Sequence, residues 1–543
     1  MIQFLAPLAL VFCVSDPAAE VPSQPLMAAV PADSIFVVSC DDPATLRANI
    51  LSHQMVRLFD GGSGAPYVDA VVDLILSEAD GENVLSSFEL VMDLCEGFDG
   101  PVVGFASMNG AGFLTASADG GGSLRAAFDK VMTLLPEAKI ENQGTHQGFQ
   151  LRSIEGGSEG DHGDAVIIRA EASGITGLFI GEGKENVLGI SKDSIRRYTA
   201  QAKSDISTLL ADARLTSGGK GSRSAIDFLL DISQVAPLLE FGYMEDCWLY
   251  GRVDTGGPTH AEAVMDLRLP KEGPVANFLD VLTPVTADDL RLIPDYALSF
   301  YAARFDLELL LERTVETWGD VAAESLEEMR QASIGATGRD LIDDFVLGFD
   351  GYFATYEVEP PTAPYDISSL IAGQGVYIAG VHDAEEMLEV LDDIISVGGM
   401  DSMIDFRDYK DVEIWAVEVD PSITPAIAFM EGQLLFSPNV ALIERAIDHA
   451  TTEGSKSIID GDAGRQLMEY GAGGFIVSHQ DTALAAWKIL AQGSMISELA
   501  PELGFLEGMP QPDLADVKRE IKGSTIMAIV RTANGILLRG ETR

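Results

Sequence analysis

The sequence has few of the residue patterns that build a catalytic or metal centre. Its four cysteines include no CxxC pair, which excludes a zinc knuckle and a thioredoxin-type redox site. Its seven histidines include no HExxH or HxH spacing. There is no GxGxxG after a strand-like segment, which argues against a dinucleotide-binding fold. We therefore assign no catalytic, cofactor-binding or metal-binding residue, and we expect no cofactor.

Basic residues are also scarce. Lysine and arginine number 35 against 85 acidic residues, and the formal net charge is −50. This excess is spread along the chain, and its field repels nucleic acid and anionic membrane surfaces. The simplest interpretation is solubility, and the alternative is a surface for Ca²⁺ or for a cationic partner. The partner is otherwise unknown, with a protein as one alternative.

Long hydrophobic runs are missing, because no segment has 18 consecutive apolar residues. We therefore expect no membrane-spanning segment in the mature chain. Residues 4–14 form an apolar run of signal-peptide length, although no lysine or arginine precedes it. We predict a leader over residues 1–19, a proline-containing linker over 20–29, and export to the periplasm or beyond the cell. Small residues suited to leader cleavage follow the run at Ser15, Ala18 and Ala19.

The cysteines do not form a complete disulfide framework. Cys13 falls within the predicted leader, and a lipid anchor there is disfavoured because bulky Phe12 precedes it. Cys40, Cys95 and Cys247 remain, an odd number. Buried free thiols are the favoured interpretation, and a bridge from Cys95 to either of the other two is the alternative.

The chain is long enough for several domains, and it contains an internal repeat. ELVMDLCEGFDG (89–100) and DLIDDFVLGFDG (340–351) are identical at six of twelve positions. Four further pairs of segments match in pattern, in the same order: 29–50 with 292–313, 112–135 with 375–398, 146–154 with 409–417, and 179–202 with 429–450. Each half then closes with a hairpin pattern, at 247–269 and 524–541. We predict two similar tandem domains.

The predicted domains cover residues 30–269 and 293–543, joined by a linker over 270–292 that contains a short helix. Strand-like and helix-like segments alternate in each, and tight hairpins occur, as at Asn534-Gly535. This combination predicts an α+β fold, with mainly antiparallel sheets backed by helices, rather than a doubly wound parallel sheet. Ser191 and Ser437 stand where a serine can cap the next helix.

One acidic segment offers oxygen and imidazole ligands. EGGSEGDHGD contains carboxylates and a histidine that can bind a divalent ion together. It is rich in glycine, lies between two strand-like segments and has no counterpart in the other half, so a solvated loop is favoured. The residues concerned are Glu155, Glu159, Asp161, His162 and Asp164.

Three other segments resemble functional motifs without meeting their requirements. DGDAG (460–464) begins like a calcium loop, but Arg465 and Gly471 stand where glycine and glutamate are needed. SGGKGSRS (217–224) has an SxxK spacing, but its glycines favour a flexible loop. Asp99 and Asp350 are the matched acids of the two GFDG blocks, and Asp-Gly after Phe favours a turn that starts the next strand.

Four features of this chain resemble features of other proteins: the segments VPADSIFVV (30–38) and DDPATLRANI (41–50), the predicted leader, and the two similar halves. Together they resemble large uncharacterised secreted protein families of environmental bacteria, whose chains begin with a Pro-x-Asp strand motif. The resemblance implies no catalytic residue.

The sequence favours an exported, non-enzymatic binding or scaffold protein built from a duplicated domain. Two alternatives stay open. One is a hydrolase-type enzyme whose site is assembled between the repeats from dispersed acids. The other is a carrier of an apolar ligand held under a curved sheet.

Overall fold

A computed structural model describes most of the chain, which divides into two compact units, Met1–Arg268 and Leu269–Arg543. The predicted leader lies outside the described residues. No helix within them has the length and apolar character needed to cross a membrane. The described residues are 24–66, 100–116, 139–155, 165–172, 174–203, 205–216, 225–235, 247–270, 273–358, 375–399, 401–419, 423–499 and 513–543.

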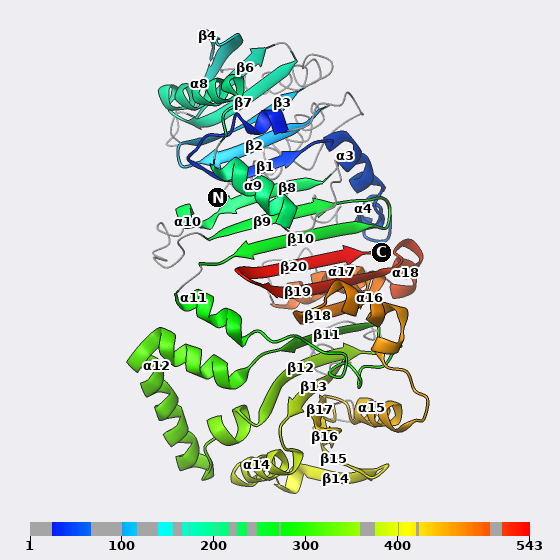
Figure 1. The fold of residues 1–543 in the computed structure, drawn as a ribbon. Helices are drawn as coiled ribbons and strands as arrows, with labels where there is room; N and C mark the ends of the chain where they lie inside the picture. The colour runs from blue at the N-terminus through cyan, green and yellow to red at the C-terminus, as the bar shows by residue number, and fades with distance from the viewer. Residues whose placement is uncertain are drawn as a thin grey trace. The chain divides into compact units, whose positions relative to one another are not determined.

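Unit 1 contains an antiparallel sheet in the order β4–β5–β6–β7–β3–β2–β1–β8–β9–β10 (Figure 1). Every residue of β1 is buried, as expected for a strand in the interior of a sheet covered on both faces. The bounds are β1 Ser34–Cys40, β2 Val102–Ser107, β3 Gly110–Ala116, β4 Lys139–His146, β5 Phe149–Glu155, β6 Ala165–Ala172, β7 Ile175–Glu182, β8 Ile226–Asp231, β9 Trp248–Asp254 and β10 Ala261–Arg268.

The two faces of this sheet carry separate apolar clusters. Helices α2 (Gln24–Met27), α8 (Lys184–Ala200) and α9 (Asp205–Thr216) pack on one face, which we call the back face. On the other face, called the front face, Leu46 of α3 (Pro43–Ser52) packs beside Phe36. The described residues of the unit also form two short helices, α4 (Gln54–Phe59) and α10 (Ile232–Val235).

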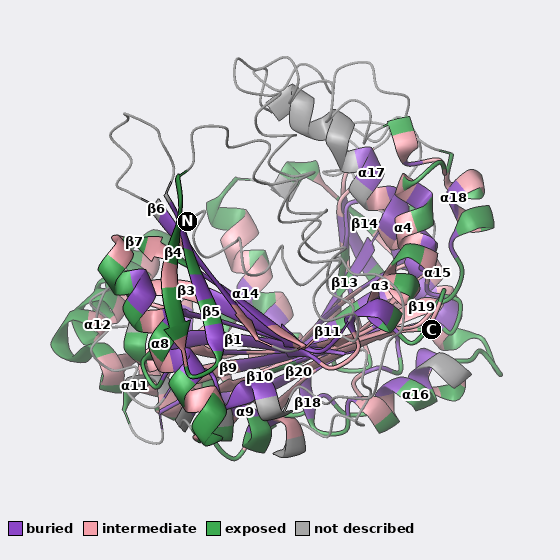
Figure 2. Ribbon diagram, turned by 90° about the horizontal axis from the view of Figure 1, so that it is seen from above, coloured by how far each residue is buried: buried purple, intermediate pink, exposed green. Residues whose placement is uncertain are grey.

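Unit 2 also contains an antiparallel sheet, in the order β14–β15–β16–β17–β13–β12–β11–β18–β19–β20. Figure 2 colours the strands and helices by how far each residue is buried. The bounds are β11 Ser299–Arg304, β12 Phe349–Glu357, β13 Gly375–Val381, β14 Ile404–Tyr409, β15 Val412–Val417, β16 Ala426–Met430, β17 Gln433–Ser437, β18 Gly474–Asp481, β19 Ser524–Thr532 and β20 Gly535–Thr542.

The back face of the unit 2 sheet packs against α15 (Val440–Thr451) and α16 (Asp462–Tyr470) through Ile443, Ile447 and Leu467. Asn439 caps α15, because its side chain accepts a hydrogen bond from Ala441 N. The other helices among the described residues of this unit are α11 (Pro274–Asn277), α12 (Leu307–Thr337), α14 (Ala384–Val397), α17 (Thr482–Leu499) and α18 (Leu514–Glu520), with short η2 (Phe278–Val281), η3 (Ile342–Val346), η4 (Asp401–Met403) and η5 (Ile458–Asp460).

The strand orders of the two units correspond one to one. Strand n of unit 1 occupies the same place as strand n + 10 of unit 2, from β4 and β14 at one edge to β10 and β20 at the other end of the order. In both units a pair of helices on the back face follows the strand in fourth place, as α8 and α9 follow β7, and as α15 and α16 follow β17. The mixed helix and antiparallel-sheet fold agrees with the α+β prediction.

Local details differ from the sequence predictions. The predicted serine caps are wrong: Gly183 and Asn439 precede the two helices, and Ser191 is buried inside α8. The β19–β20 turn consists of Ala533 and Asn534, since Thr532 pairs with Gly535. The segment predicted as a linker, 270–292, supplies Val285, Leu290 and Leu292 to the core of unit 2.

Candidate functional site

Of the matched aspartates, Asp350 is described and Asp99 lies outside the described residues. Asp350 is the second residue of β12, where its Oδ2 is 3.1 Å from Arg304 Nη2 and its Oδ1 accepts a hydrogen bond from Tyr352 N. The next residue, Gly351, has a φ of +83° at an irregularity in the pairing with β13. The Asp-Gly pair therefore forms a bulge at the start of the strand, a structural role.

The other candidate motifs give no assembled site. Asp460 completes a capping box with Ser457 at η5, so this segment starts a helix. Ser217–Ser224 and nine residues of the acidic EGGSEGDHGD segment lie outside the described residues. Within the described ranges no group of three or more histidine, cysteine or acidic side chains is placed to hold a metal ion.

The thiols described in the structure, Cys40 and Cys247, are buried and free. Burial raises the pKa of the Cys40 thiol, and burial followed by the charge of Asp231 raises the pKa of Cys247. Both stay protonated at neutral pH, and a thiol is a much weaker nucleophile than a thiolate. Neither has the character of a catalytic cysteine.

A buried charge cluster lies in unit 1 around Asp227, which is 4% exposed. Its carboxylate is 2.8 Å from Arg214 Nη2 and 3.6 Å from Arg252 Nη1, and the hydroxyl of Tyr250 donates to it at 2.5 Å. Arg214 also donates to the hydroxyl of Ser39 at 2.6 Å. The cluster joins β1, β8, β9 and α9, so it fixes the interior of the unit.

The front face of the unit 2 sheet is likewise the face opposite its back-face helices, and each front face carries a continuous row of directly paired residues that crosses all ten strands. In unit 1 every member is apolar: Ile140, Ile154, Ile167, Ile180, Ala111, Ala106, Phe36, Leu230, Leu249 and Leu267. In unit 2 the row is Phe406, Trp415, Ile427, Phe436, Tyr377, Thr355, Tyr301, Ser478, Met527 and Gly540.

The unit 2 row is aromatic and exposed at one end. Phe406, Tyr377, Tyr301 and Phe436 are 54%, 45%, 41% and 39% exposed. Phe406 packs edge-on against Trp415, with ring centroids 5.4 Å apart, and Tyr377 packs against Phe436 at 5.7 Å. Rings in mutual contact are held in place, so they form a pre-shaped surface rather than scattered exposed side chains.

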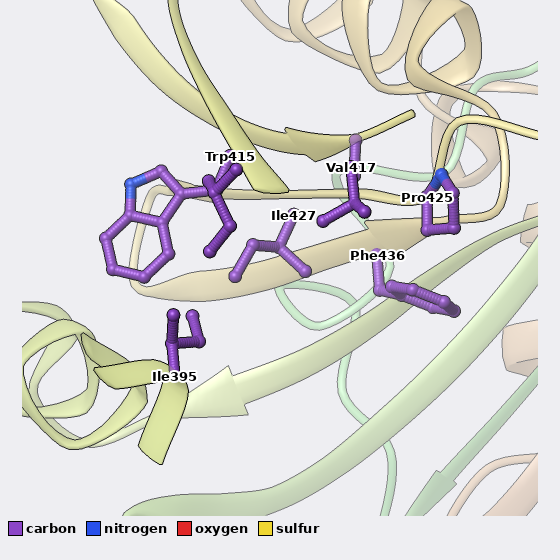
Figure 3. Close-up of a pocket in the computed structure, with 8 residues that line it drawn as sticks. Ile395, Trp415, Val417, Pro425, Ile427 and Phe436 are labelled. Carbon is purple, nitrogen blue, oxygen red and sulfur yellow. The ribbon is translucent and has the colours of Figure 1, made fainter. Parts of the chain in front are cut away.

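A groove opens on this front face, between the row and α14. It has a volume of ≈160 Å³. Figure 3 shows Trp415, Val417, Ile427 and Phe436 on neighbouring strands, with Ile395 reaching them from the helix. The lining is apolar throughout and consists of Ile395, Ile404, Trp415, Val417, Pro425, Ala426, Ile427 and Phe436. We call this the apolar groove.

Two carboxylates lie beside the apolar groove. Asp408 and Glu413 are direct partners in the β14–β15 ladder, and strand alternation places them on the same face as Phe406 and Trp415. Glu413 Oε1 accepts a hydrogen bond from Trp415 Nε1 at 2.6 Å. Among the described residues neither acid forms an ion pair. The two carboxylates therefore concentrate negative charge at one place on the sheet. Like charges directly opposite each other repel, which disfavours the pairing of the two strands.

The hairpin that carries these acids is fixed to α15. Tyr409 donates to Asp448 Oδ1 at 2.9 Å, and Lys410 Nζ lies 2.6 Å from the same oxygen. Hydrogen bonds from Lys410 and then Tyr409 lower the pKa of Asp448. The turn residues Lys410 and Asp411 both have positive φ, as a tight two-residue hairpin turn requires.

Comparisons of this chain with protein-family models, curated proteins and solved structures find no match. The assignment of function therefore depends on the geometry described above. Sequence reasoning missed the apolar groove, because its residues come from four strands, a loop and a helix. The available signal was the alternation in IDFRDY (404–409), which places Phe406 between charged neighbours on an edge strand.

Proposed function

We propose that this protein is an exported, non-enzymatic binding protein built from two copies of one α+β module, and that unit 2 carries a binding surface. The observation that carries the binding role is the apolar groove beside an exposed row of aromatic rings. Large apolar side chains held exposed on a rigid sheet mark interaction sites. The matching strand orders support duplication, and the amino-terminal apolar run supports export.

The size of the groove favours docking of a side chain over transport of a whole ligand. Pockets that enclose drug-sized molecules have volumes of about 300–1,000 Å³. The apolar groove, at ≈160 Å³, accommodates one large side chain or a comparable apolar group. We therefore favour a binding surface over the carrier alternative.

The proposal is tested with Nile red, a neutral apolar dye that the net charge of −50 does not repel. We expect saturable binding near one dye per chain. Phe436→Ala removes a ring that lines the groove, and we expect it to weaken binding about tenfold, as loss of one buried aromatic contact does.

The matched control is Tyr301→Ala. Tyr301 lies in the same row with a similar exposure, 41% against 39%, but does not line the groove. We expect it to leave dye affinity unchanged within about twofold, the range of indirect effects at a distant site. Equal losses for the two variants, or no saturable binding by a chain that unfolds cooperatively, would refute the binding role.

A further inference from the structure

We propose that the groove surface binds a segment of another protein that carries a large apolar side chain flanked by basic residues. This inference rests on the proposed function and adds the chemistry of the partner. The apolar side chain enters the apolar groove, and the basic residues pair with Asp408 and Glu413.

The apolar part of the inference follows from the lining. Every lining residue is apolar, and the one polar tip among them, Trp415 Nε1, already donates to Glu413. A sugar or nucleotide in the groove loses hydrogen bonds to water without regaining them, which disfavours both. A leucine- or phenylalanine-sized side chain loses none and is favoured by the burial of its apolar surface.

The basic part follows from charge complementarity. Asp408 and Glu413 face each other on adjacent strands, exposed and without a basic partner among the described residues. A cation placed between them relieves their repulsion as well as gaining its own ion pairs. The rest of the chain strengthens this preference, because a net charge of −50 attracts basic segments and slows the approach of acidic ones.

The spacing sets the pattern of the partner. Glu413 and Trp415 are two residues apart on β15, so their Cα atoms are separated by about 7 Å. An extended partner segment matches this distance when its basic residue lies two positions from its apolar residue, since such residues point to the same side.

The test uses three capped seven-residue peptides. The first has leucine at its centre, lysine two positions to either side and alanine elsewhere. The second replaces both lysines with glutamate, and the third replaces the leucine with alanine. Binding is measured by titration calorimetry and by displacement of Nile red from the full chain.

We expect the lysine–leucine peptide to bind and to displace the dye, and both other peptides to bind at least about tenfold more weakly. Asp408→Asn combined with Glu413→Gln is expected to weaken the first peptide about fivefold, an effect that high salt removes. The glutamine keeps an oxygen that can accept from Trp415 Nε1, so the ring stays oriented.

The matched control is Asp405→Asn. Asp405 lies on the same strand as Asp408 but points to the opposite face, where it pairs with Arg407. We expect this variant to bind the lysine–leucine peptide as the parent chain does. Asp408→Asn made alone changes the net charge by the same amount as this control, and equal weakening by the two single variants would assign the effect to net charge and overturn the proposed contact.

Other outcomes separate this inference from the proposed function. Dye binding without displacement by the lysine–leucine peptide overturns the partner chemistry and leaves the binding role intact. Equal affinity for the lysine and glutamate peptides also overturns the partner chemistry and leaves the binding role intact. Light scattering tests whether the chain forms dimers. Dimers that Phe436→Ala abolishes would assign the groove to a second copy of this protein, which would also overturn the inference. Absence of dye binding refutes both proposals.

Discussion

Arg304 holds Asp350, the second residue of β12, with 3.1 Å between Nη2 and Oδ2. The same guanidinium contacts Asp289 through Nη1 at 2.5 Å, so it joins β11 to two acids from different segments. The contact fixes the bulge that Asp350 and Gly351 form. In unit 2 the GFDG block, part of the strongest repeat in the sequence, therefore encodes backbone geometry.

Gly351→Ala tests this role. A Cβ at Gly351 would lie 1.7 Å from the carbonyl oxygen of Phe305, at a φ of +83° that favours glycine. We expect a loss of at least about 2 kcal/mol in the free energy of unfolding, measured by urea denaturation. Gly399→Ala is the control, since Gly399 also has positive φ but has open space at its Cβ. Equal effects of the two changes would contradict the argument from the clash.

Asp227→Ala tests the buried charge cluster of unit 1. Removing the carboxylate leaves Arg214 and Arg252 without the acid that they contact in the interior. We expect destabilisation of about 3–5 kcal/mol, the usual cost of breaking a buried ion pair from one side. Asp193→Ala, which removes the i,i+3 partner of the exposed Arg196, should cost less than about 1 kcal/mol. Chemical denaturation of both variants gives the comparison.

The hydrogen bonds at Asp448 predict that the stability of the folded chain depends on pH in the acid range. Its carboxylate accepts hydrogen bonds from Lys410 and Tyr409, which lower its pKa below the ordinary value of 3.8. The folded chain thus binds this proton less readily than the unfolded chain, and the stabilisation is present above pH 3.8 and is lost as the pH falls through the lowered value. We expect the thermal midpoint of Asp448→Asn to lie below that of the parent at neutral pH and to approach it in strong acid. A constant difference across this range would contradict the prediction.

The burial of His479 predicts a second dependence of folding stability on pH, closer to neutrality. It stacks on Phe300, and burial lowers its pKa below 6.5, while Asp481 opposes the shift. The unfolded chain binds the proton more readily, so stability falls as the pH drops below 6.5. His479→Phe keeps the stacked ring and removes the titrating group. Between neutral and mildly acidic pH we expect this variant to lose less stability than the parent chain does. The control is His382→Asn, a change at an exposed histidine, which we expect to lose as much stability as the parent.

The order of elements could be predicted from the sequence because local patterns encode it. Residues 146–154 and 409–417 alternate in polarity, and they fall on the matching hairpins β4–β5 and β14–β15. Helix starts were less predictable, since Ser191 and Ser437 are both plausible caps in the sequence and the tertiary packing buries both of them.

The sequence alone determined the composition of the surface, the succession of strands and helices, and the repetition of that succession, because these depend on residues close together in the chain. The register of the strands was decided by the tertiary structure. Tyr377 meets Phe436 only because β13 and β17, distant in the sequence, pair at particular positions, and a shift of one residue would turn each ring to the other face. The aromatic row and the apolar groove exist for that reason.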